Sequence, residues 1–167
     1  FLQDSKGTED EVHYVSICSP NHLHASHIKM AFRHGANAIC EKPIVLTTDE
    51  IEELKALEIQ TGYKVSTILQ LRVHDAIRAL KTKIENGPKK KHEIELTYIT
   101  SRGDWYHRSW KGDVRKSGGL TTNIGVHFFD MITWIFGNPT ANTVHVKNET
   151  VASGVLELEK ATVKWFL

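Results

Sequence analysis

Apolar and polar residues follow two different patterns along this chain. Up to residue 72, short apolar runs are separated by longer segments with apolar residues at helical spacing, which predicts strand–helix–strand–helix–strand. The β-branched character of the short runs is typical of strands in a buried parallel sheet. The strands are predicted over residues 12–18, 37–41 and 63–69.

Capping and breaking residues locate the helices between these strands. Ser19-Pro20-Asn21 supplies a cap and an early proline for the first helix, and Gly35 is suited to end it. Thr47 and Glu50 form a capping box at the start of the second helix, which Gly62 ends. The inward residues of the second helix are predicted to be Ile51, Leu54 and Leu57.

The pattern changes after a third helix, which is predicted over residues 74–85. Every second residue from 94 to 98 is apolar, which predicts a strand with one solvated face. A loop rich in Trp and Arg is expected over residues 102–116, and a well-buried helix over residues 120–136. Three more strands are predicted over residues 143–147, 155–159 and 162–167.

These elements predict a fold of class α/β plus α+β. Residues 1–72 would form the βαβαβ half of a doubly wound sheet, and residues 73–167 an α+β domain with a mostly antiparallel sheet. The chain opens without Met in a polar connection over residues 3–11, and it closes on a strand-like run without a turn. Both features predict an internal fragment of a longer protein.

Composition narrows the function classes. The chain of 167 residues is 40% hydrophobic and 25% charged, as in folded globular proteins. A net charge of +1 gives no argument for nucleic acid or an anionic membrane as partner. There is no apolar run long enough to span a bilayer and no signal peptide. Cys18 and Cys40 lie in apolar runs, where we expect buried free thiols and a cytoplasmic protein.

Lys42 is the first candidate for chemistry. It follows the predicted strand that ends at Glu41, and Pro43 closes that strand because proline cannot donate to a sheet. Ligands of open α/β sheets bind beyond the carboxyl ends of the strands, so Lys42 would project toward a ligand. The alternative is a solvated Lys at a strand end.

Asn123 and His127 form a second candidate pair, because residues four apart share one face of a helix. A histidine is suited to proton abstraction near neutral pH. The alternative is a core histidine bonded to backbone. Gly118-Gly119, just before this helix, permits positive φ or a close backbone approach.

Residues 105–112, Trp-Tyr-His-Arg-Ser-Trp-Lys-Gly, are dense in aromatic and basic side chains. Such a segment can stack on a base or sugar and neutralise a phosphate, or it can simply pack its rings under the sheet. A metal site is not expected at His22, His24 and His27, because helical spacings of two and three cannot direct all three toward one ion. The chain has no Gly-x-Gly-x-x-Gly turn for a pyrophosphate.

In this order the motifs resemble those of the Gfo/Idh/MocA class of nicotinamide-dependent sugar oxidoreductases, over the whole chain. The motifs are Ser19-Pro20-Asn21-x-x-His24, Cys40-Glu41-Lys42-Pro43, Gly118-Gly119 and Gly125-Val126-His127-x-x-Asp130. The class carries its glycine-rich turn in a preceding βα unit and continues its larger sheet further on. The resemblance therefore implies that residues 1–72 are the C-terminal part of a Rossmann domain, which binds dinucleotides, and that residues 73–167 are part of a substrate and oligomerisation domain. A fragment of this kind would bind NAD poorly.

Within the class, residues 14–21, 70–74, 99–103, 105–112 and 122–130 are similar to the UDP-N-acetylglucosaminuronate 3-dehydrogenases of lipopolysaccharide O-antigen biosynthesis. This similarity implies oxidation of the C3 hydroxyl of a UDP-sugar uronate, with NAD as cofactor. It leaves open whether NAD is released or is retained and recycled by 2-oxoglutarate. It also implies a homo-oligomer formed through the C-terminal sheet.

The resemblance implies a role for each matching residue. The cofactor-binding residues would be Ser19, Pro20, Asn21, His24, Glu41, Lys42 and Pro43. Lys42 would polarise the sugar hydroxyl and His127 would remove its proton. Many class members carry Asp where this chain has Asn123, which cannot exchange a proton and would instead position substrate, so that the role of base falls to His127 or Lys42. Together with Asn123 and His127, the substrate-binding candidates are Arg72, Tyr106 and Arg108, because arginine binds carboxylate and diphosphate through two hydrogen bonds.

Two alternatives remain open from the sequence. One is a dehydrogenase of the same class that acts on a free sugar or a cyclitol, against which the aromatic and basic segment argues mildly. The other is a non-catalytic interaction module that pairs through an exposed sheet face. Convergence of Lys42 and His127 on one hydroxyl would distinguish an enzyme from a module.

Overall fold

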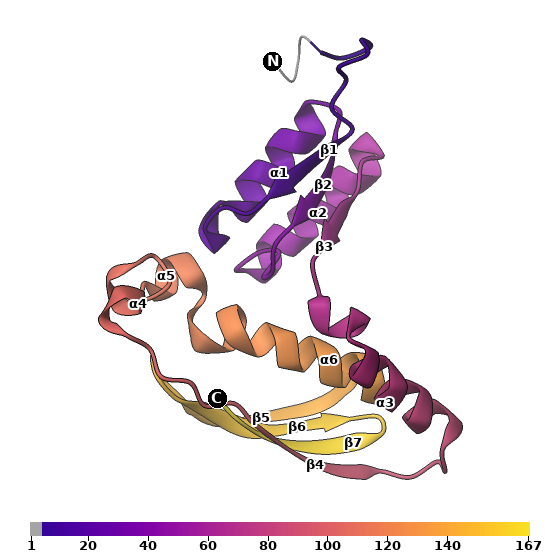
Figure 1. Ribbon diagram of the computed structural model, residues 1–167, viewed down its shortest axis with the longest axis vertical. Coiled ribbons are helices and arrows are strands. Elements are labelled where there is room, and N and C mark those ends of the chain that lie inside the picture. The colour runs from indigo at the N-terminus through magenta and orange to yellow at the C-terminus, as the bar shows by residue number, and fades with distance from the viewer. Residues whose placement is uncertain (1–4) are drawn as a thin grey trace. The chain divides into compact units, whose positions relative to one another are not determined.

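The structure, a computed structural model, describes residues 5–167 of the chain (Figure 1). Their contacts divide the chain into two compact units. Unit 1 contains the chain up to Ile68 together with Arg115–Gly118, and unit 2 contains Leu69–Val114 and Gly119–Leu167. Of the polar connection predicted over residues 3–11, Gln3 and Asp4 lie outside the described residues, whereas residues 5–10 form turns and bends.

Unit 1 is built on a parallel sheet with strand order β1-β2-β3. The strands are β1 (Tyr14–Ile17), β2 (Asn37–Cys40) and β3 (Val65–Thr67). Each lies inside a predicted strand segment, so the strand–helix–strand order is confirmed. One expectation is wrong: Tyr14 is 63% and Ile39 is 37% exposed, so the sheet is covered on one face only among the described residues.

The covered face carries α1 (His24–Arg33) and α2 (Thr48–Thr61), which pack side by side. The predicted capping box of α2 is confirmed: Glu50 N donates to Thr47 Oγ1, and Thr47 N donates to Glu50 Oε2. Gly62 ends this helix in the left-handed region, at φ 77°. Leu54 is buried as predicted, but Ile51 is exposed and does not face the core.

The start of the first helix differs from the prediction. A 3-10 turn, η1 (Asn21–Leu23), precedes α1, and the Leu23 N–H donates to the carbonyl of Pro20 at 2.9 Å. No side chain caps either helix start. The two polar side chains expected to do so, those of Ser19 and Asn21, make other contacts that belong to the candidate site.

Unit 2 begins with η2 (Gln70–Val73) and α3 (Asp75–Asn86), and its sheet has the strand order β4-β7-β6-β5. The strands are β4 (His92–Thr97), β5 (Pro139–Lys147), β6 (Ala152–Leu158) and β7 (Ala161–Phe166). The β5–β6 and β6–β7 pairs are antiparallel, whereas β4 and β7 run parallel. The prediction of a mostly antiparallel sheet is confirmed. The parallel pair of β4 and β7 makes it a mixed sheet.

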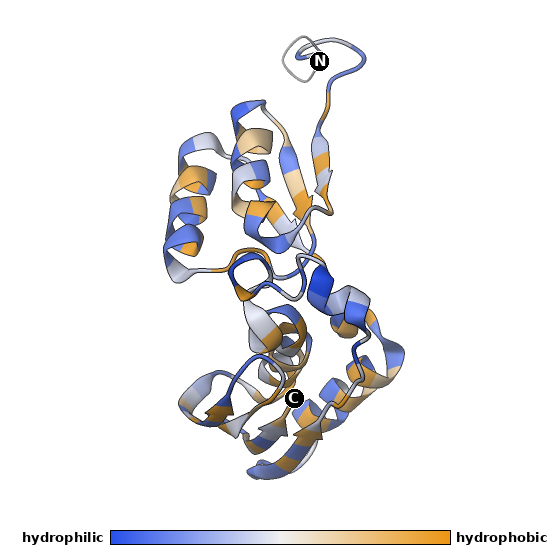
Figure 2. Cartoon of the chain, turned by 90° about the vertical axis from the view of Figure 1, so that its left-hand side faces the viewer, coloured by the Kyte–Doolittle hydropathy of each residue, from blue (hydrophilic) through white to orange (hydrophobic). Residues whose placement is uncertain are grey.

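The helix predicted over residues 120–136 is present as a π-helical turn, η3 (Thr121–Gly125), that continues into α6 (Val126–Phe136). This helix lies across the sheet, where its Ile132, Ile135 and Phe136 join a buried core with Val163 and Trp165 (Figure 1). The strands show alternating hydrophobic and hydrophilic residues, as one covered face requires (Figure 2).

The segment predicted as a loop over residues 102–116 is more ordered than expected. It contains two short helices, α4 (Asp104–Arg108) and α5 (Val114–Ser117). Apolar periodicity did not predict these helices, because they are too short to show a helical period.

Candidate active site

Two loops leave the same edge of the unit 1 sheet. Ile17 of β1 and Cys40 of β2 are paired in register, and both strands end there. Residues 19–21 follow the first strand and residues 41–43 follow the second. Since the carboxyl ends of parallel strands bind ligands in open α/β sheets, the residues predicted to bind the cofactor are gathered on two neighbouring loops.

His24 joins these two loops. Its ring lies 2.7 Å from the Pro43 carbonyl oxygen through Nδ1 and 2.8 Å from the Ser19 carbonyl oxygen through Nε2. A neutral imidazole carries one N–H and donates to one of them at a time, whereas the doubly protonated ring donates to both. His24 is 0% exposed, so it has no surface to offer a ligand. It holds the backbone of both loops in place.

The polar side chains of the first loop are also engaged. Ser19 Oγ lies 2.9 Å from Nδ1 of His27. Asn21 is buried and its Nδ2 donates to the carbonyl of Ser117 at 2.9 Å. Sequence reasoning assigned no role to Ser117. Gly118 and Gly119 follow it at φ 81° and 75°, so of the two alternatives predicted for this pair, positive φ and a close backbone approach, the structure shows positive φ.

The second loop contains Glu41 and Lys42, both partly buried. The Lys42 N–H donates to Oε2 of Glu41 at 3.3 Å. The preceding thiol of Cys40 is fully enclosed, and burial, followed by the charge of Glu41, raises its pKa to about 12. Cys18 is exposed, contrary to the prediction, because it lies on the uncovered face of the sheet.

In unit 2, η3 and α6 carry the predicted pair of site residues, Asn123 and His127. Asn123 is buried at 6% exposure, and His127, one turn later, is partly buried. The glycine of the Gly-x-His-x-x-Asp motif has a packing role: a Cβ on Gly125 would lie 2.7 Å from the Phe129 ring and 2.9 Å from Leu167. The helix can approach the sheet this closely only without a side chain there.

Arg72, a substrate-binding candidate, is bound to Asp130. Its Nε donates to Oδ2 at 2.9 Å and its Nη2 to Oδ1 at 2.6 Å. These hydrogen bonds, which outweigh the effect of burial, raise the pKa of Arg72. The guanidinium also lies 5.7 Å from the ring centroid of Trp134. Asp130 was known from the sequence as the last residue of the Gly-x-His-x-x-Asp motif, but nothing in the sequence indicated a partner so far along the chain.

Tyr106 connects the aromatic and basic segment to this face. Asn123 Nδ2 donates to its hydroxyl at 3.4 Å, and the Arg102 guanidinium lies 4.8 Å above its ring. Arg108 is exposed. Arg102 was not among the predicted site residues, although it lies in one of the stretches that carried the resemblance.

The two tryptophans of this segment share a cation. Lys111 Nζ lies 5.7 Å from the Trp105 ring centroid and 5.8 Å from that of Trp110. Trp105 is 61% exposed, so it is not packed under the sheet. The segment therefore presents aromatic and basic groups at its surface, as ligand binding requires.

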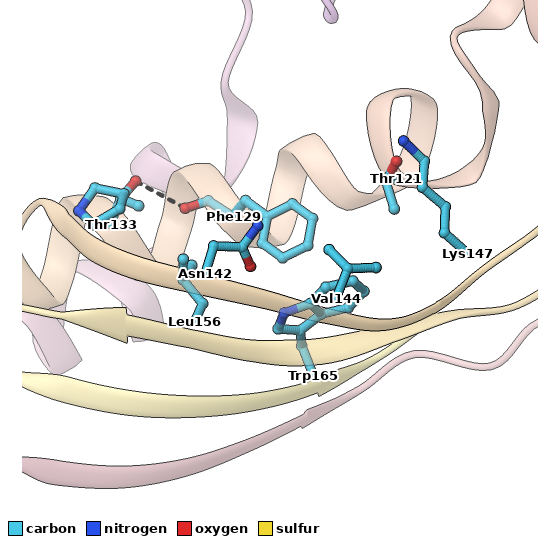
Figure 3. Close-up of a pocket in the computed structure, with 9 residues that line it drawn as sticks. Thr121, Phe129, Thr133, Asn142, Val144, Lys147, Leu156 and Trp165 are labelled. Atoms are coloured by element: carbon cyan, nitrogen blue, oxygen red, sulfur yellow. Dashed lines mark hydrogen bonds between the residues drawn. The ribbon is translucent and has the colours of Figure 1, made fainter.

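A cavity of about 390 Å³ lies between α6 and the strands of unit 2 (Figure 3). Its lining includes the apolar residues Phe129, Leu156 and Trp165 and the polar residues Asn142 and Lys147. None of the predicted site residues lines it. Asn123 and His127 therefore belong to another face of the helix.

Within residues 5–167, His, Cys, Asp and Glu side chains form no group of three or more that could hold a metal ion. No helix in that same range has the length and apolar character needed to cross a membrane.

The two parts of the chain match two models of one protein family. Residues 2–68 match the oxidoreductase family's NAD-binding Rossmann fold, and residues 81–163 match its C-terminal alpha/beta domain. The chain belongs to the Gfo/Idh/MocA oxidoreductase family. The recognition made from the motifs and the two-part fold are both confirmed.

Among solved structures, the chain is 52% identical to the WlbA (WbpB) dehydrogenase from Thermus thermophilus. The crystal structure of that protein in complex with NAD and UDP-GlcNAcA matches with a TM-score of 0.94 over 99% of this chain and 54% of that chain. Its structure in complex with NAD and alpha-ketoglutarate matches with a TM-score of 0.93 over 99% and 53%.

Two curated relatives are more distant. An uncharacterized oxidoreductase of Bacillus subtilis, YrbE, is 32% identical over 78% of this chain and 37% of its own length. The D-glucoside 3-dehydrogenase of Escherichia coli is 28% identical over 78% of this chain and 38% of its own length. The chain thus spans about half of the solved relative and less than two fifths of these curated relatives.

Proposed function

We propose that this chain is part of an NAD-dependent dehydrogenase that oxidises the C3 hydroxyl of a UDP-N-acetyl-amino-sugar uronate to a ketone, in lipopolysaccharide O-antigen biosynthesis. The observation that carries the proposal is the 52% identity, over 99% of the chain, to a dehydrogenase crystallised with NAD and UDP-GlcNAcA. The crystal structure of that relative with alpha-ketoglutarate favours an enzyme in which a 2-oxo acid reoxidises the cofactor.

Unit 1 offers a fitting surface for part of NAD. The loops of residues 19–21 and 41–43 leave neighbouring strands at the ligand-binding edge, and the enclosed His24 ring fixes their carbonyl groups. Ser19, Pro20, Asn21, Glu41 and Pro43 would line the nicotinamide side. The bound cofactor would supply the hydride acceptor. The pyrophosphate would need a glycine-rich turn, and this sequence contains none.

The chemistry assigned to the chain is proton removal. We assign Lys42 to the sugar hydroxyl, where its ammonium would polarise the oxygen, and His127 to the proton of that hydroxyl. As the hydroxyl proton passes to His127, the C3–H bond breaks, its electron pair leaves as hydride, and a C=O bond forms. Asn123 would orient the substrate by hydrogen bonding, since an amide cannot take up a proton.

A second candidate is supported by the relative from Escherichia coli. Its name, D-glucoside 3-dehydrogenase, describes oxidation at C3 of a sugar without a nucleotide. Such an enzyme could use the same Lys and His, and it would not need the anionic groups of a UDP-uronate. The substrate, and not the reaction type, distinguishes the two candidates.

Association of copies through the sheet of unit 2 remains a prediction. The uncovered face of the sheet carries Phe166, which is 40% exposed, and the partly exposed Val155. Light scattering of the wild type and of Phe166→Glu tests the prediction. Dissociation by the charged residue would support it, and an unchanged mass would contradict it.

The test of the function uses the product of the whole open reading frame. UDP-GlcNAcA is supplied with NAD or with 2-oxoglutarate, and the 3-keto product is followed by mass spectrometry. Lys42→Ala and His127→Ala should each lower turnover by about 10²- to 10⁴-fold. The exposed Lys83→Ala and His145→Ala serve as matched controls that should keep wild-type turnover. Turnover of D-glucosides with none of UDP-GlcNAcA would favour the second candidate. If no sugar is turned over, the enzymatic proposal fails.

A further inference from the structure

Arg102 carries a buried donor without an acceptor. Among the described residues its Nη2 atom is inaccessible to solvent and has no hydrogen-bond partner. A guanidinium is charged at every physiological pH and offers only donors. Buried donors in folded proteins are nearly always paired, and an unpaired charged donor is the most costly kind. Arg102 as a whole is only partly buried, so an acceptor from outside the chain can approach its guanidinium group and meet the unpaired donor.

Contacts within unit 2 connect Arg102 to the proposed chemistry. Its guanidinium lies 4.8 Å above the Tyr106 ring, and the Tyr106 hydroxyl accepts from Asn123 at 3.4 Å. Asn123 lies one helical turn before His127. Two contacts thus separate Arg102 from the helix face that carries the proposed base.

Local hydrogen bonds and close packing hold the backbone of the segment that follows Arg102. Ser109 Oγ donates to the Tyr106 carbonyl at 2.8 Å, and the Lys111 N–H donates to Ser109 Oγ at 3.3 Å. A Cβ on Gly112 would lie 2.7 Å from backbone atoms of His107, so the chain turns back against α4 at a position where only glycine fits. These contacts position the backbone of Tyr106, whose ring lies beneath Arg102.

The other basic groups near the segment are less suited to an anion. Arg72 already gives two hydrogen bonds to Asp130. Arg108 is exposed, so an ion bound there would compete with water. Lys111 lies on two tryptophan rings. Among these four, only Arg102 combines a supported guanidinium plane with a buried, unpaired donor.

We infer that Arg102 binds an oxyanion of the substrate and thereby selects anionic sugars. This inference rests on the proposed function and adds a specificity residue that the motifs did not indicate. A carboxylate and a phosphate share the required chemistry, because both present two oxygens to the guanidinium fork. The two sources in the proposed substrate are the uronate carboxylate and the diphosphate.

The experiment compares kcat/KM for UDP-GlcNAcA and for UDP-GlcNAc, which lacks the carboxylate, on the product of the whole open reading frame. Arg102→Met keeps a long side chain on the Tyr106 ring and removes the charge, so it tests the anion contact without emptying the site. We expect it to lower kcat/KM for UDP-GlcNAcA by about 10- to 100-fold, as loss of a hydrogen bond to a charged group does. Arg78→Ala, an exposed change on α3, is the matched control.

The two substrates distinguish the two oxyanions. If Arg102→Met lowers kcat/KM for UDP-GlcNAcA only, the anion that Arg102 binds is the carboxylate. If it lowers kcat/KM equally for both substrates, the anion is the diphosphate. Added guanidinium ion should partly restore the activity of Arg102→Ala, which a purely structural role does not predict. Equal kcat/KM of wild type and Arg102→Met on both substrates would overturn the inference. Failure of the wild type on both substrates would instead contradict the proposed function.

Discussion

Asp130 holds the guanidinium of Arg72 through both of its carboxylate oxygens, at 2.9 and 2.6 Å. Arg72 lies in η2, at the start of unit 2, and Asp130 lies in α6. Asp130 is the last residue of the Gly-x-His-x-x-Asp motif, and in this structure its partner is a side chain of the chain itself. The motif thus joins a proposed catalytic group, His127, to a structural one, Asp130, which anchors η2 to the helix.

Loss of this ion pair should destabilise unit 2. Asp130→Ala should lower the free energy of unfolding by about 1–2 kcal/mol, less than for a fully buried charged pair because the Arg72 side chain is 41% exposed. Urea denaturation followed by tryptophan fluorescence measures it, since all four tryptophans lie in unit 2. A double-mutant cycle with Arg72→Ala should give a coupling energy of about 1 kcal/mol. Additive effects of the two changes would show that the pair contributes nothing.

Much of the fold follows from local signals in the sequence. The capping box of Thr47 and Glu50 and the end at Gly62 could be predicted because both depend on residues close in the chain. The burial of Ile51 was predicted wrongly, because periodicity identifies an apolar face and not the width that a neighbouring element covers. The short helices α4 and α5 were missed for lack of a period.

The residues of the candidate site were predicted from the sequence, but their contacts within the chain were not. His24 was predicted to lie beside the cofactor, and the sequence did not indicate that its ring joins Ser19 to Pro43. Arg72 was predicted to bind substrate, and the sequence did not indicate its ion pair with Asp130. Both partners depend on tertiary packing between segments distant in sequence. Local patterns carry no information about such pairs.

We expect His24 to stabilise unit 1 and to hold its two loops in position, and not to contact a ligand. His24→Ala would remove the ring that lies between the carbonyls of Ser19 and Pro43 and would open a cavity, so we expect the free energy of unfolding of unit 1 to fall by about 2–3 kcal/mol. Hydrogen exchange of the Glu41 amide, which donates to Ile17 O at 3.0 Å, should become faster.

The exposed His13→Ala is the matched control for His24 and should change stability by less than about 0.5 kcal/mol. Unchanged Glu41 exchange in His24→Ala would mean that the ring does not hold the loops. Equal effects of the two histidine changes would lead to the same conclusion.

The two cysteines should differ in reactivity and in pH dependence. Cys18 is exposed and should react with a disulfide reagent at neutral pH, whereas Cys40 should react only after unfolding. Burial raises the pKa of Cys40 from 9.0 to about 12. Above pH 9 the unfolded thiol loses its proton while the folded thiol keeps it, so the folded state loses stability by about 1.4 kcal/mol per pH unit up to pH 12.

The measurement for Cys40 is urea denaturation from pH 8 to 10.5, followed by far-UV circular dichroism. Cys40→Ala lacks the thiol, so its stability should fall less steeply than that of the wild type above pH 9. Parallel curves for the two proteins would contradict the raised pKa of the folded thiol. Cys18→Ala, the control, should follow the wild type.

Trp165 should contribute through its ring and not through its N–H. It is 4% exposed, it meets Phe129 edge to face at 5.2 Å, and its Nε1 has no partner within the described residues. Trp165→Phe keeps an aromatic ring beside the cavity and removes no hydrogen bond. We therefore expect the free energy of unfolding to fall by about 1 kcal/mol, against about 3–5 kcal/mol for Trp165→Ala. Urea denaturation followed by the three remaining tryptophans measures both. If Trp165→Phe lost as much as Trp165→Ala, the indole N–H would have to donate a hydrogen bond in the folded protein, and the contribution of the ring alone would be refuted.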